Sequence, residues 1–241
     1  MRDYLLFDLD GTLTDPKEGI TKSVQYALRH YGIQVEDLDQ LIPFIGPPLM
    51  DSFQEYYGFT PEQAKEGVQV YREYFTSKGW QENLMFPGIP EMLKRLKEAG
   101  KHLYVATSKP EVFALRILKH FDLEPYFEGV GGADLEEKRC RKADVIRYLL
   151  EREGICGAGQ DSPWQDGAGG PEPSAEGEGK EVLGHILMVG DRKHDVLGAA
   201  QLGIGCVGVD YGYAAPGELE ESGAIAVVKT VEELRDLLLT L

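Results

Sequence analysis

The chain begins with a short apolar run that ends in two acidic residues. Residues 4–7 are apolar and are followed by Asp8-Leu9-Asp10-Gly11-Thr12. Such a run is typical of a strand buried in a parallel sheet. Two carboxylates beside a buried strand are costly unless a cation offsets their charge, which indicates a divalent-metal site. An isolated Asp-x-Asp also suits a turn, so its partners further along the chain decide between the two interpretations.

Residues 15–86 carry a helical pattern. Apolar residues recur near a 3.6-residue period, and Thr60-Pro61 has the form of an N-cap followed by proline at the first helical position. Residues 43–48, Pro43-Phe44-Ile45-Gly46-Pro47-Pro48, are predicted to form a loop. The predicted helices cover 17–31, 37–42, 49–57 and 60–78.

From residue 87 onward, strand patterns alternate with helix patterns, which predicts a parallel sheet with right-handed crossovers. We expect an α/β fold: a doubly wound, Rossmann-like core made of residues 1–14 and 87–241, with an all-helical block at 15–86. The predicted strands are 102–106, 127–130, 185–189, 204–209 and 224–228, and the predicted helices are 88–99, 111–120, 142–152, 195–202, 216–222 and 231–239.

The stretch 156–181 differs in composition from the rest of the core. It is rich in Gly, Pro, Ser and acidic residues, and its one aromatic residue is Trp164. Such a segment buries too little apolar surface to offset the entropy of ordering it. We expect a flexible surface insertion here.

Charge and composition narrow the class of function. Acidic residues outnumber basic ones 41 to 25, which gives a formal net charge of −16. This argues against non-specific nucleic-acid binding and against anionic membranes, and an anionic substrate needs local positive charge. We see no charged-then-apolar leader and no apolar run near the roughly 18 residues of a membrane span. The three cysteines are far apart and lack metal-ligand spacing, so we expect a reduced, cytoplasmic protein. We also expect a monomer or a weak dimer.

Polar residues follow three of the predicted strands. The carboxyl ends of parallel strands meet at one edge of a sheet, which brings these residues together. Four carboxylates at one edge require a metal ion and a base, and a lysine that opens the predicted 142–152 helix could supply the base. The residues are Asp8, Asp10, Thr107, Ser108, Asp191, Asp195 and Lys142.

This set resembles the four motifs of the haloacid dehalogenase superfamily, in the right order and over nearly the whole chain. The motifs are Asp8-Leu9-Asp10-Gly11-Thr12, Thr107, Lys142 within Arg139-x-x-Lys142, and Gly190-Asp191-Arg192-x-x-Asp195. The helical block then resembles the four-helix cap of the phosphoglycolate-phosphatase-like group. One departure is Leu135-Glu136-Glu137-Lys138, where relatives carry Leu-Asp-Gly-Thr before the third motif.

The resemblance implies a role for each residue, and each role suits its chemistry. Asp8 would be the nucleophile that forms an aspartyl-phosphate, and Asp10 the general acid–base. Mg²⁺ would be held by Asp8, the Asp10 carbonyl and Asp191, with Asp195 in support. The phosphoryl oxygens would be bound by Thr107, Ser108 and Lys142.

The second carboxylate, Asp10, indicates phosphate-ester hydrolysis, since members that cleave carbon–halogen bonds lack it. The resemblance implies a phosphatase for a small phosphorylated metabolite, with a phosphoglycolate-like ester as the leading substrate. Two alternatives remain open: a 5'-nucleotidase, and a non-catalytic regulator that binds phosphorylated ligands. Substrate choice is expected to depend on Gly46 and Pro47 in the cap loop and on Arg72.

Three further polar residues lie near the motifs in the sequence. His194 is as well explained by a surface position as by a contact to substrate or to a metal-bound water. For Arg192, a salt bridge is favoured over contact with the cap or substrate. Lys17 lies near the expected hinge, and a structural role is favoured over a substrate role.

Overall fold

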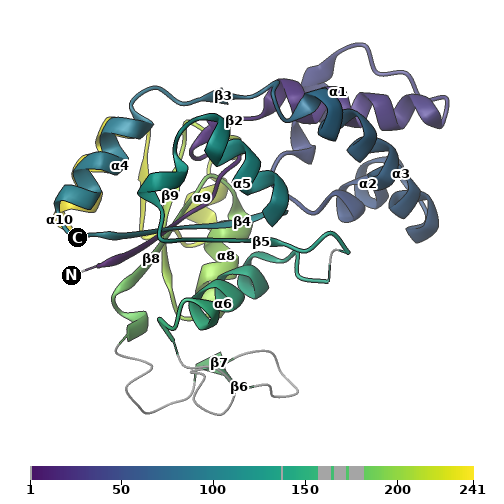
Figure 1. The fold of residues 1–241 in the computed structure, drawn as a ribbon. Helices are drawn as coiled ribbons and strands as arrows, with labels where there is room; N and C mark the ends of the chain where they lie inside the picture. Colours follow the sequence, from purple (N-terminus) through teal and green to yellow (C-terminus); the bar gives the residue numbers. More distant parts are fainter. Residues whose placement is uncertain (1, 137, 157–163, 166–171, 174–181) are drawn as a thin grey trace.

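The computed structural model describes residues 2–136, 138–156, 164–165, 172–173 and 182–241. A six-stranded sheet lies at its centre, in the order β10-β9-β8-β1-β4-β5, and every neighbouring pair is parallel. This arrangement confirms the predicted α/β fold (Figure 1). The strands are β1 (Tyr4–Phe7), β4 (His102–Pro110), β5 (Gly129–Ala133), β8 (Ile186–Gly190), β9 (Gly205–Val209) and β10 (Ala226–Val228).

Helices cover both faces of this sheet. One face carries α4 (Ile89–Glu98), α5 (Glu111–His120) and α10 (Val231–Thr240), and the other carries α6 (Lys142–Arg152), α8 (Lys193–Gln201) and the short α9 (Glu218–Glu221). A further 3₁₀ turn, η3 (Glu124–Tyr126), precedes β5. None of the helices that the structure describes is long and apolar enough to cross a membrane.

The alternation of side chains along the strands explains the two layers. Leu5 and Phe7 of β1 point into the larger apolar cluster, and Leu6, between them, points into the smaller cluster on the opposite face. All three side chains are fully buried. A strand buried on both faces needs apolar residues at every position, which is the pattern the sequence shows from Tyr4 to Phe7.

The segment between β1 and α4 is largely helical and stands to one side of the sheet (Figure 1). A two-stranded antiparallel pair joins it to the sheet layer, with Thr14 opposite Met85 and Asp15 opposite Leu84. Both connections between the helical segment and the sheet layer therefore pass through this pair. The elements of the helical segment are β2 (Thr14–Asp15), α1 (Lys17–His30), η1 (Leu38–Phe44), α2 (Leu49–Tyr57), α3 (Pro61–Tyr74), η2 (Phe75–Gly79) and β3 (Leu84–Met85).

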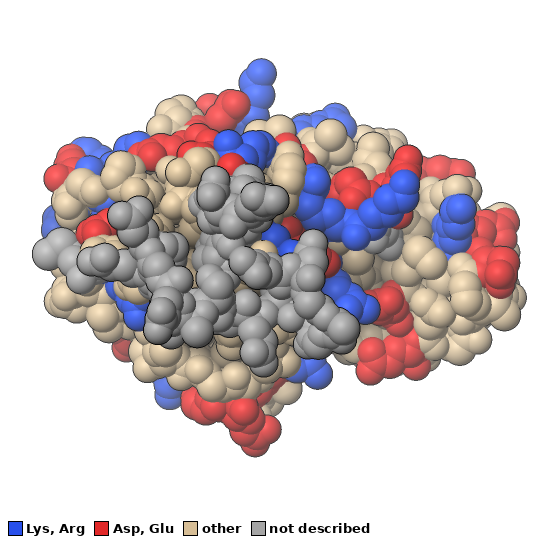
Figure 2. All heavy atoms as spheres, turned by 90° about the horizontal axis from the view of Figure 1, so that it is seen from below, with Lys and Arg blue, Asp and Glu red and all other residues tan. Residues whose placement is uncertain are grey.

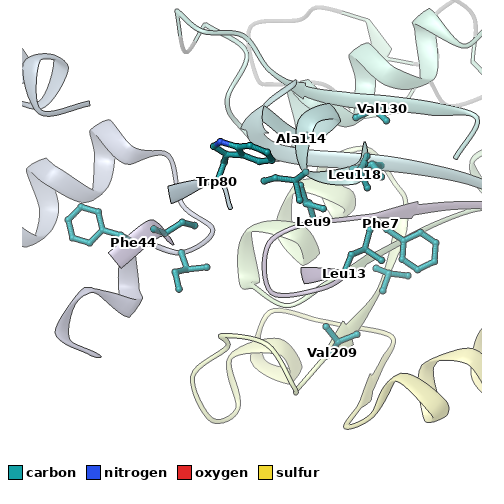
Figure 3. Close-up of a cluster of buried hydrophobic side chains, with 14 of the residues drawn as sticks. Phe7, Leu9, Leu13, Phe44, Trp80, Ala114, Leu118, Val130 and Val209 are labelled. Atoms are coloured by element: carbon teal, nitrogen blue, oxygen red, sulfur yellow. The ribbon is translucent and has the colours of Figure 1, made fainter. Parts of the chain in front are cut away.

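The larger apolar cluster continues from the sheet into this helical segment. Figure 3 shows Phe7, Leu9 and Leu13 near the sheet, and Phe44 and Trp80 nearer the helical segment. The segment therefore packs on the sheet layer through continuous apolar contact as well as through its two connecting chains.

The structure differs from the sequence prediction at the ends of several elements. The 3₁₀ helix η1 continues through Pro43 to Phe44, so the predicted loop begins two residues later. Helix α3 passes into a π-helical turn at Phe75 instead of remaining regular to Lys78. Strand β4 runs beyond Ala106 to Pro110, with a shift in its pairing to β5, and so carries three polar residues to the sheet edge.

The prediction of a flexible surface insertion at 156–181 is wrong at Trp164, which is buried. Most of this stretch lies outside the described residues, but Trp164–Gln165 (β6) pairs with Glu172–Pro173 (β7). The Trp164 side chain is 2% exposed within the smaller apolar cluster, and its indole N–H donates to the Leu202 carbonyl at 3.1 Å. Average composition missed this contact, because one large aromatic residue can anchor an otherwise polar segment.

We expect Trp164→Ala to lower the free energy of unfolding by about 3–5 kcal/mol, as for other buried Trp or Phe truncations. Trp164→Phe retains most of the apolar contact but leaves the Leu202 carbonyl without its donor, so its loss is expected to be smaller. Leu239→Ala, at a position 37% exposed, serves as a control. Urea unfolding of the three variants is the measurement, and equal stability of Trp164→Ala and wild type would contradict this burial.

Candidate active site

Three neighbouring strands bring the polar residues of the motifs together. Strand β1 lies between β4 and β8, so Asp8 follows the central strand, Thr107 lies on one neighbour, and Asp191 follows the other. The Asp8 N–H donates to the Val189 carbonyl at 2.9 Å and thereby continues the ladder between β1 and β8. Parallel pairing in register thus places residues that are far apart in the sequence at one edge of the sheet.

A tight turn follows the first strand and closes against the third. Gly11 has φ +81°, and a Cβ there would lie 2.0 Å from Asp191 Oδ2. The turn therefore requires a residue that tolerates positive φ and leaves room for this carboxylate. The Gly11 N–H donates to the Thr14 carbonyl at 2.7 Å, which directs the chain into the two-stranded connection.

Four carboxylates gather at this edge, and all are nearly excluded from solvent. Asp8, Asp10, Asp191 and Asp195 are 4%, 7%, 0% and 1% exposed. Burial is the main reason that the pKa of Asp191 is well above its usual value, and repulsion from Asp195 and Asp8 adds to the rise. Burial likewise raises the pKa of Asp195 to about 6, although Lys142 acts in the opposite direction. The pKa of Asp10 is raised by burial too.

Lys142 provides positive charge beneath the nucleophile candidate. It is the first residue of α6, and its Nζ lies 2.9 Å from Asp8 Oδ1 and 2.7 Å from Asp195 Oδ1. It also donates to the Ala106 carbonyl at 3.0 Å. Burial alone would lower the pKa of Lys142, but Asp195 and Asp8 outweigh it and raise the pKa. The lysine is therefore held charged.

A second cation, Lys109, was missed in the sequence. Its ammonium forms an ion pair with Asp10 Oδ2 and lies 4.9 Å from the centre of the Phe75 ring. The sequence did carry a signal for Lys109. Side chains two residues apart on a strand share a face, so if Thr107 faces the site, Lys109 is expected to face it too. The Thr107 hydroxyl accepts the Lys109 backbone N–H at 3.3 Å.

The carboxylates fit a divalent cation. Oxygens from Asp8, Asp191 and Asp195 lie within 4.8 Å of one another. Asp191 Oδ2 accepts the Tyr213 N–H, whereas Oδ1 is buried and has no hydrogen-bond partner among the described residues. Both oxygens of Asp195 are engaged, one with Lys142 and the other with the Arg192 N–H. A hard cation would satisfy the free Asp191 oxygen, with Asp195 left in a supporting position.

A pocket opens between these residues and the helical segment. The sheet edge contributes Asp8, Asp10, Thr107, Ser108 and Lys109 to its wall. The helical segment contributes the three residues predicted to govern substrate choice, Gly46, Pro47 and Arg72, together with a group of apolar side chains: Ile20, Phe44, Leu49, Tyr71 and Phe75, with Phe113 added from α5.

Arg72 also joins the helical segment to the loop before the third motif. Its Nη1 donates to the Leu135 carbonyl at 3.0 Å. That loop is held in turn by Asp134, whose carboxylate accepts backbone N–H groups from Glu136, Lys138 and Arg139. Asp134 therefore holds the described residues Glu136 and Lys138 of the unusual sequence before Lys142.

The remaining polar residues lie outside the pocket wall described here. Lys17 forms an ion pair with Asp39 at 2.7 Å, with both side chains well exposed, which fits a structural role. His194 is partly buried on α8, and burial, followed by repulsion from Arg192 and Lys193, lowers its pKa. Arg192 forms the favoured salt bridge, with Glu218 at 3.0 Å, and also reaches the cap-loop region, where it donates to the Ile45 carbonyl.

Comparisons with known proteins agree with this geometry. A family model described as haloacid dehalogenase-like hydrolase matches residues 5–158, and a second model of related hydrolases matches residues 168–237. A 5'-nucleotidase of Pseudomonas aeruginosa is 46% identical over 215 residues, covering 89% of this chain and 86% of that protein. A protein named tyrosine-protein kinase PtkA, from Mycobacterium tuberculosis, is 36% identical over 97% of this chain and 72% of its own length.

The structural comparison extends to the whole chain. A crystal structure of a predicted phosphatase from Clostridium acetobutylicum has a TM-score of 0.87 and 43% identity, and covers 100% of both chains. Such a match includes the helical segment as well as the sheet layer. Together with the family model, it shows that this chain belongs to the haloacid dehalogenase-like hydrolases.

Proposed function

We propose that this hydrolase is a Mg²⁺-dependent phosphatase that cleaves small phosphate monoesters through an aspartyl-phosphate on Asp8. The observation that carries the proposal is the pairing of two carboxylates with two different cations. Asp8 is paired with Lys142, and Asp10 with Lys109. Separate partners allow the two acids separate tasks, one as nucleophile and one as acid–base, in the same water-poor pocket.

In the first step, an Asp8 oxygen attacks phosphorus and Asp10 donates a proton to the departing alcohol oxygen. In the second step, Asp10 accepts a proton from water, which attacks the phosphoryl group and releases Asp8. Throughout, Lys142 neutralises part of the charge around Asp8, while Thr107 and Ser108 donate hydrogen bonds to phosphoryl oxygens. Both halves of the reaction then use the same acid–base group, in opposite directions.

The metal site of this proposal consists of Asp8, the Asp10 carbonyl and Asp191, with Asp195 as support. When bound, Mg²⁺ would draw charge from the phosphoryl oxygens and lower repulsion between the phosphate dianion and the carboxylates. The free oxygen of Asp191 and the depth of its burial favour this residue as a ligand.

The helical segment, residues 15–86, is proposed to act as a cap that closes over the leaving group. Its face of the pocket is mostly apolar and aromatic. Such a wall suits a leaving group with a flat apolar face, as in a nucleoside monophosphate, better than the small carboxylate of phosphoglycolate. The 46% identical relative named 5'-nucleotidase supports the same choice. We therefore propose nucleoside monophosphates ahead of phosphoglycolate, which the sequence alone favoured.

Charge supports a small substrate in place of a polymer or a membrane. The chain has a net charge of −16, and on the face seen in Figure 2 acidic side chains form several clusters with basic ones among them. The buried thiols of Cys156 and Cys206 are free, which suits a reducing compartment. We propose action in the cytoplasm, as a monomer or weak dimer.

Turnover of p-nitrophenyl phosphate tests the proposed activity and separates an enzyme from a non-catalytic phospho-ligand-binding protein. We expect Mg²⁺-dependent hydrolysis that EDTA removes and added Mg²⁺ restores. We expect Asp8→Asn to lower kcat by at least about 10³-fold, because the amide keeps the shape but loses the nucleophile.

Asp210→Asn is the matched control, because it makes the same change at an exposed position. Mass spectrometry of the Asp8→Asn protein would exclude deamidation back to Asp. Hydrolysis near the wild-type rate in Asp8→Asn would rule out the covalent route, and absence of hydrolysis in wild type would favour the binding protein.

A substrate panel tests the proposed leaving group. We expect nucleoside monophosphates to have higher kcat/KM than phosphoglycolate, and Phe113→Ala to lower the value for nucleotides by about tenfold, in line with loss of one aromatic stacking contact. Phe113 is only partly buried, so its truncation spares most of the core.

Phe121→Ala removes a partly buried phenylalanine that is absent from the pocket wall, and serves as the control. A higher kcat/KM for phosphoglycolate, lost in Arg72→Ala but kept in Phe113→Ala, would reverse the choice of substrate.

A further inference from the structure

Arg192 connects the carboxylate cluster to the loop of the helical segment. It directly follows Asp191, and its side chain contacts Glu218 and the Ile45 carbonyl. Its Nε lies 3.0 Å from Glu218 Oε1, and its Nη1 donates to the Ile45 carbonyl at 2.6 Å. The side chain is only 10% exposed. The guanidinium therefore contacts the sheet layer with one edge and the cap with the other.

The contact with Glu218 is held independently of the cap. The Glu218 carboxylate also accepts backbone N–H groups from Lys193 at 2.8 Å and Ala215 at 3.1 Å, and both residues belong to the sheet layer. Three donors thus fix Glu218, and Glu218 fixes the guanidinium. Among the hydrogen bonds of this guanidinium, movement of the cap would break only the one to Ile45, so Arg192 presents a charged donor whose position Glu218 already fixes.

The loop is shaped to receive this side chain. Gly46 has φ +105°, and a Cβ there would lie 3.0 Å from Arg192 Cγ, closer than most real Cβ contacts. From the sequence, Gly46 was expected to influence substrate choice. It does line the pocket, but its tightest approach is to the stem of Arg192.

A continuous series of polar contacts leads from this loop to the nucleophile. After the Ile45–Arg192 hydrogen bond, the Arg192 backbone N–H donates to Asp195 Oδ2 at 3.0 Å. Asp195 Oδ1 lies 2.7 Å from Lys142 Nζ, which lies 2.9 Å from Asp8 Oδ1. Each link joins two buried groups, so displacement of one is felt by the next.

We propose that Arg192 is a positioning residue that couples docking of the 43–48 loop to the alignment of Asp191, Asp195 and Asp8. The proposal rests on the proposed phosphatase function for its catalytic consequence. Docking of the loop would align the carboxylates when substrate is enclosed, so that a closed cap and a competent nucleophile occur together.

Hydrogen exchange of the substrate-free protein tests the docking contact without any need for activity. Arg192→Lys keeps the positive charge but loses the planar fork that reaches Glu218 and Ile45 together. We expect amides of residues 44–49 to exchange several-fold faster in this variant, while those of α3 keep the wild-type rate. Lys193→Met, a change at the exposed neighbouring side chain, is the control and should leave both regions unchanged.

Kinetics test the coupling. We expect Arg192→Lys and Gly46→Ala each to lower kcat for the best nucleotide by about tenfold or more. Both variants should remain folded at the assay temperature by circular dichroism, and the KM of Arg192→Lys for p-nitrophenyl phosphate should stay near the wild-type value. The fall in kcat would then not reflect loss of folded enzyme. If both variants break the same contact, the double variant should be no slower than the slower single variant.

Unchanged exchange at 44–49 in Arg192→Lys would overturn the docking contact, and multiplicative losses in the double variant would overturn the coupling. If the proposed phosphatase function is wrong, the wild-type protein will hydrolyse no phosphate ester. The exchange measurement would still decide whether Arg192 holds the loop.

Discussion

The balance of charge among the buried carboxylates is the constraint on which the rest of the site depends. Asp8, Asp10, Asp191 and Asp195 would carry four negative charges, and Lys142 and Lys109 supply two positive ones in direct contact. Four negative and two positive charges leave a net charge of −2 in a site that excludes water, which is costly. Burial raises the pKa values of Asp10, Asp191 and Asp195, and repulsion among the carboxylates adds to the rise. One divalent cation would restore balance.

The fold supplies the geometry that this balance requires. Parallel strands β4, β1 and β8 end at the same edge, and Gly11 lets the chain turn closely over Asp191. The helical segment then closes the pocket with apolar side chains that exclude water but carry little charge. In the proposed function, the sheet edge acts on the phosphoryl group that all substrates share, while the helical segment contacts the leaving group.

The sequence predicted the sheet, most helices and the residues at the strand ends, because local periodicity and the rule for parallel strands carry that information. Helices α2, α5 and α6 begin and end at the predicted residues. It did not predict contacts that depend on how distant elements pack. The Lys109–Asp10 pair joins residues 99 positions apart, the Arg192–Ile45 contact spans 147, and burial of Trp164 depends on the Leu202 carbonyl.

The central claim, that a divalent cation balances this cluster, is tested most directly by thermal unfolding of wild type and Asp191→Asn, each with EDTA or with increasing Mg²⁺. The account predicts that Mg²⁺ raises the melting temperature of wild type in a concentration-dependent way. It also predicts that Asp191→Asn is more stable than wild type in EDTA, because a buried unpaired charge is gone, and that Mg²⁺ stabilises it far less. Two results together would contradict the account: Mg²⁺ leaves the melting temperature of wild type unchanged, and Asp191→Asn is less stable than wild type in EDTA.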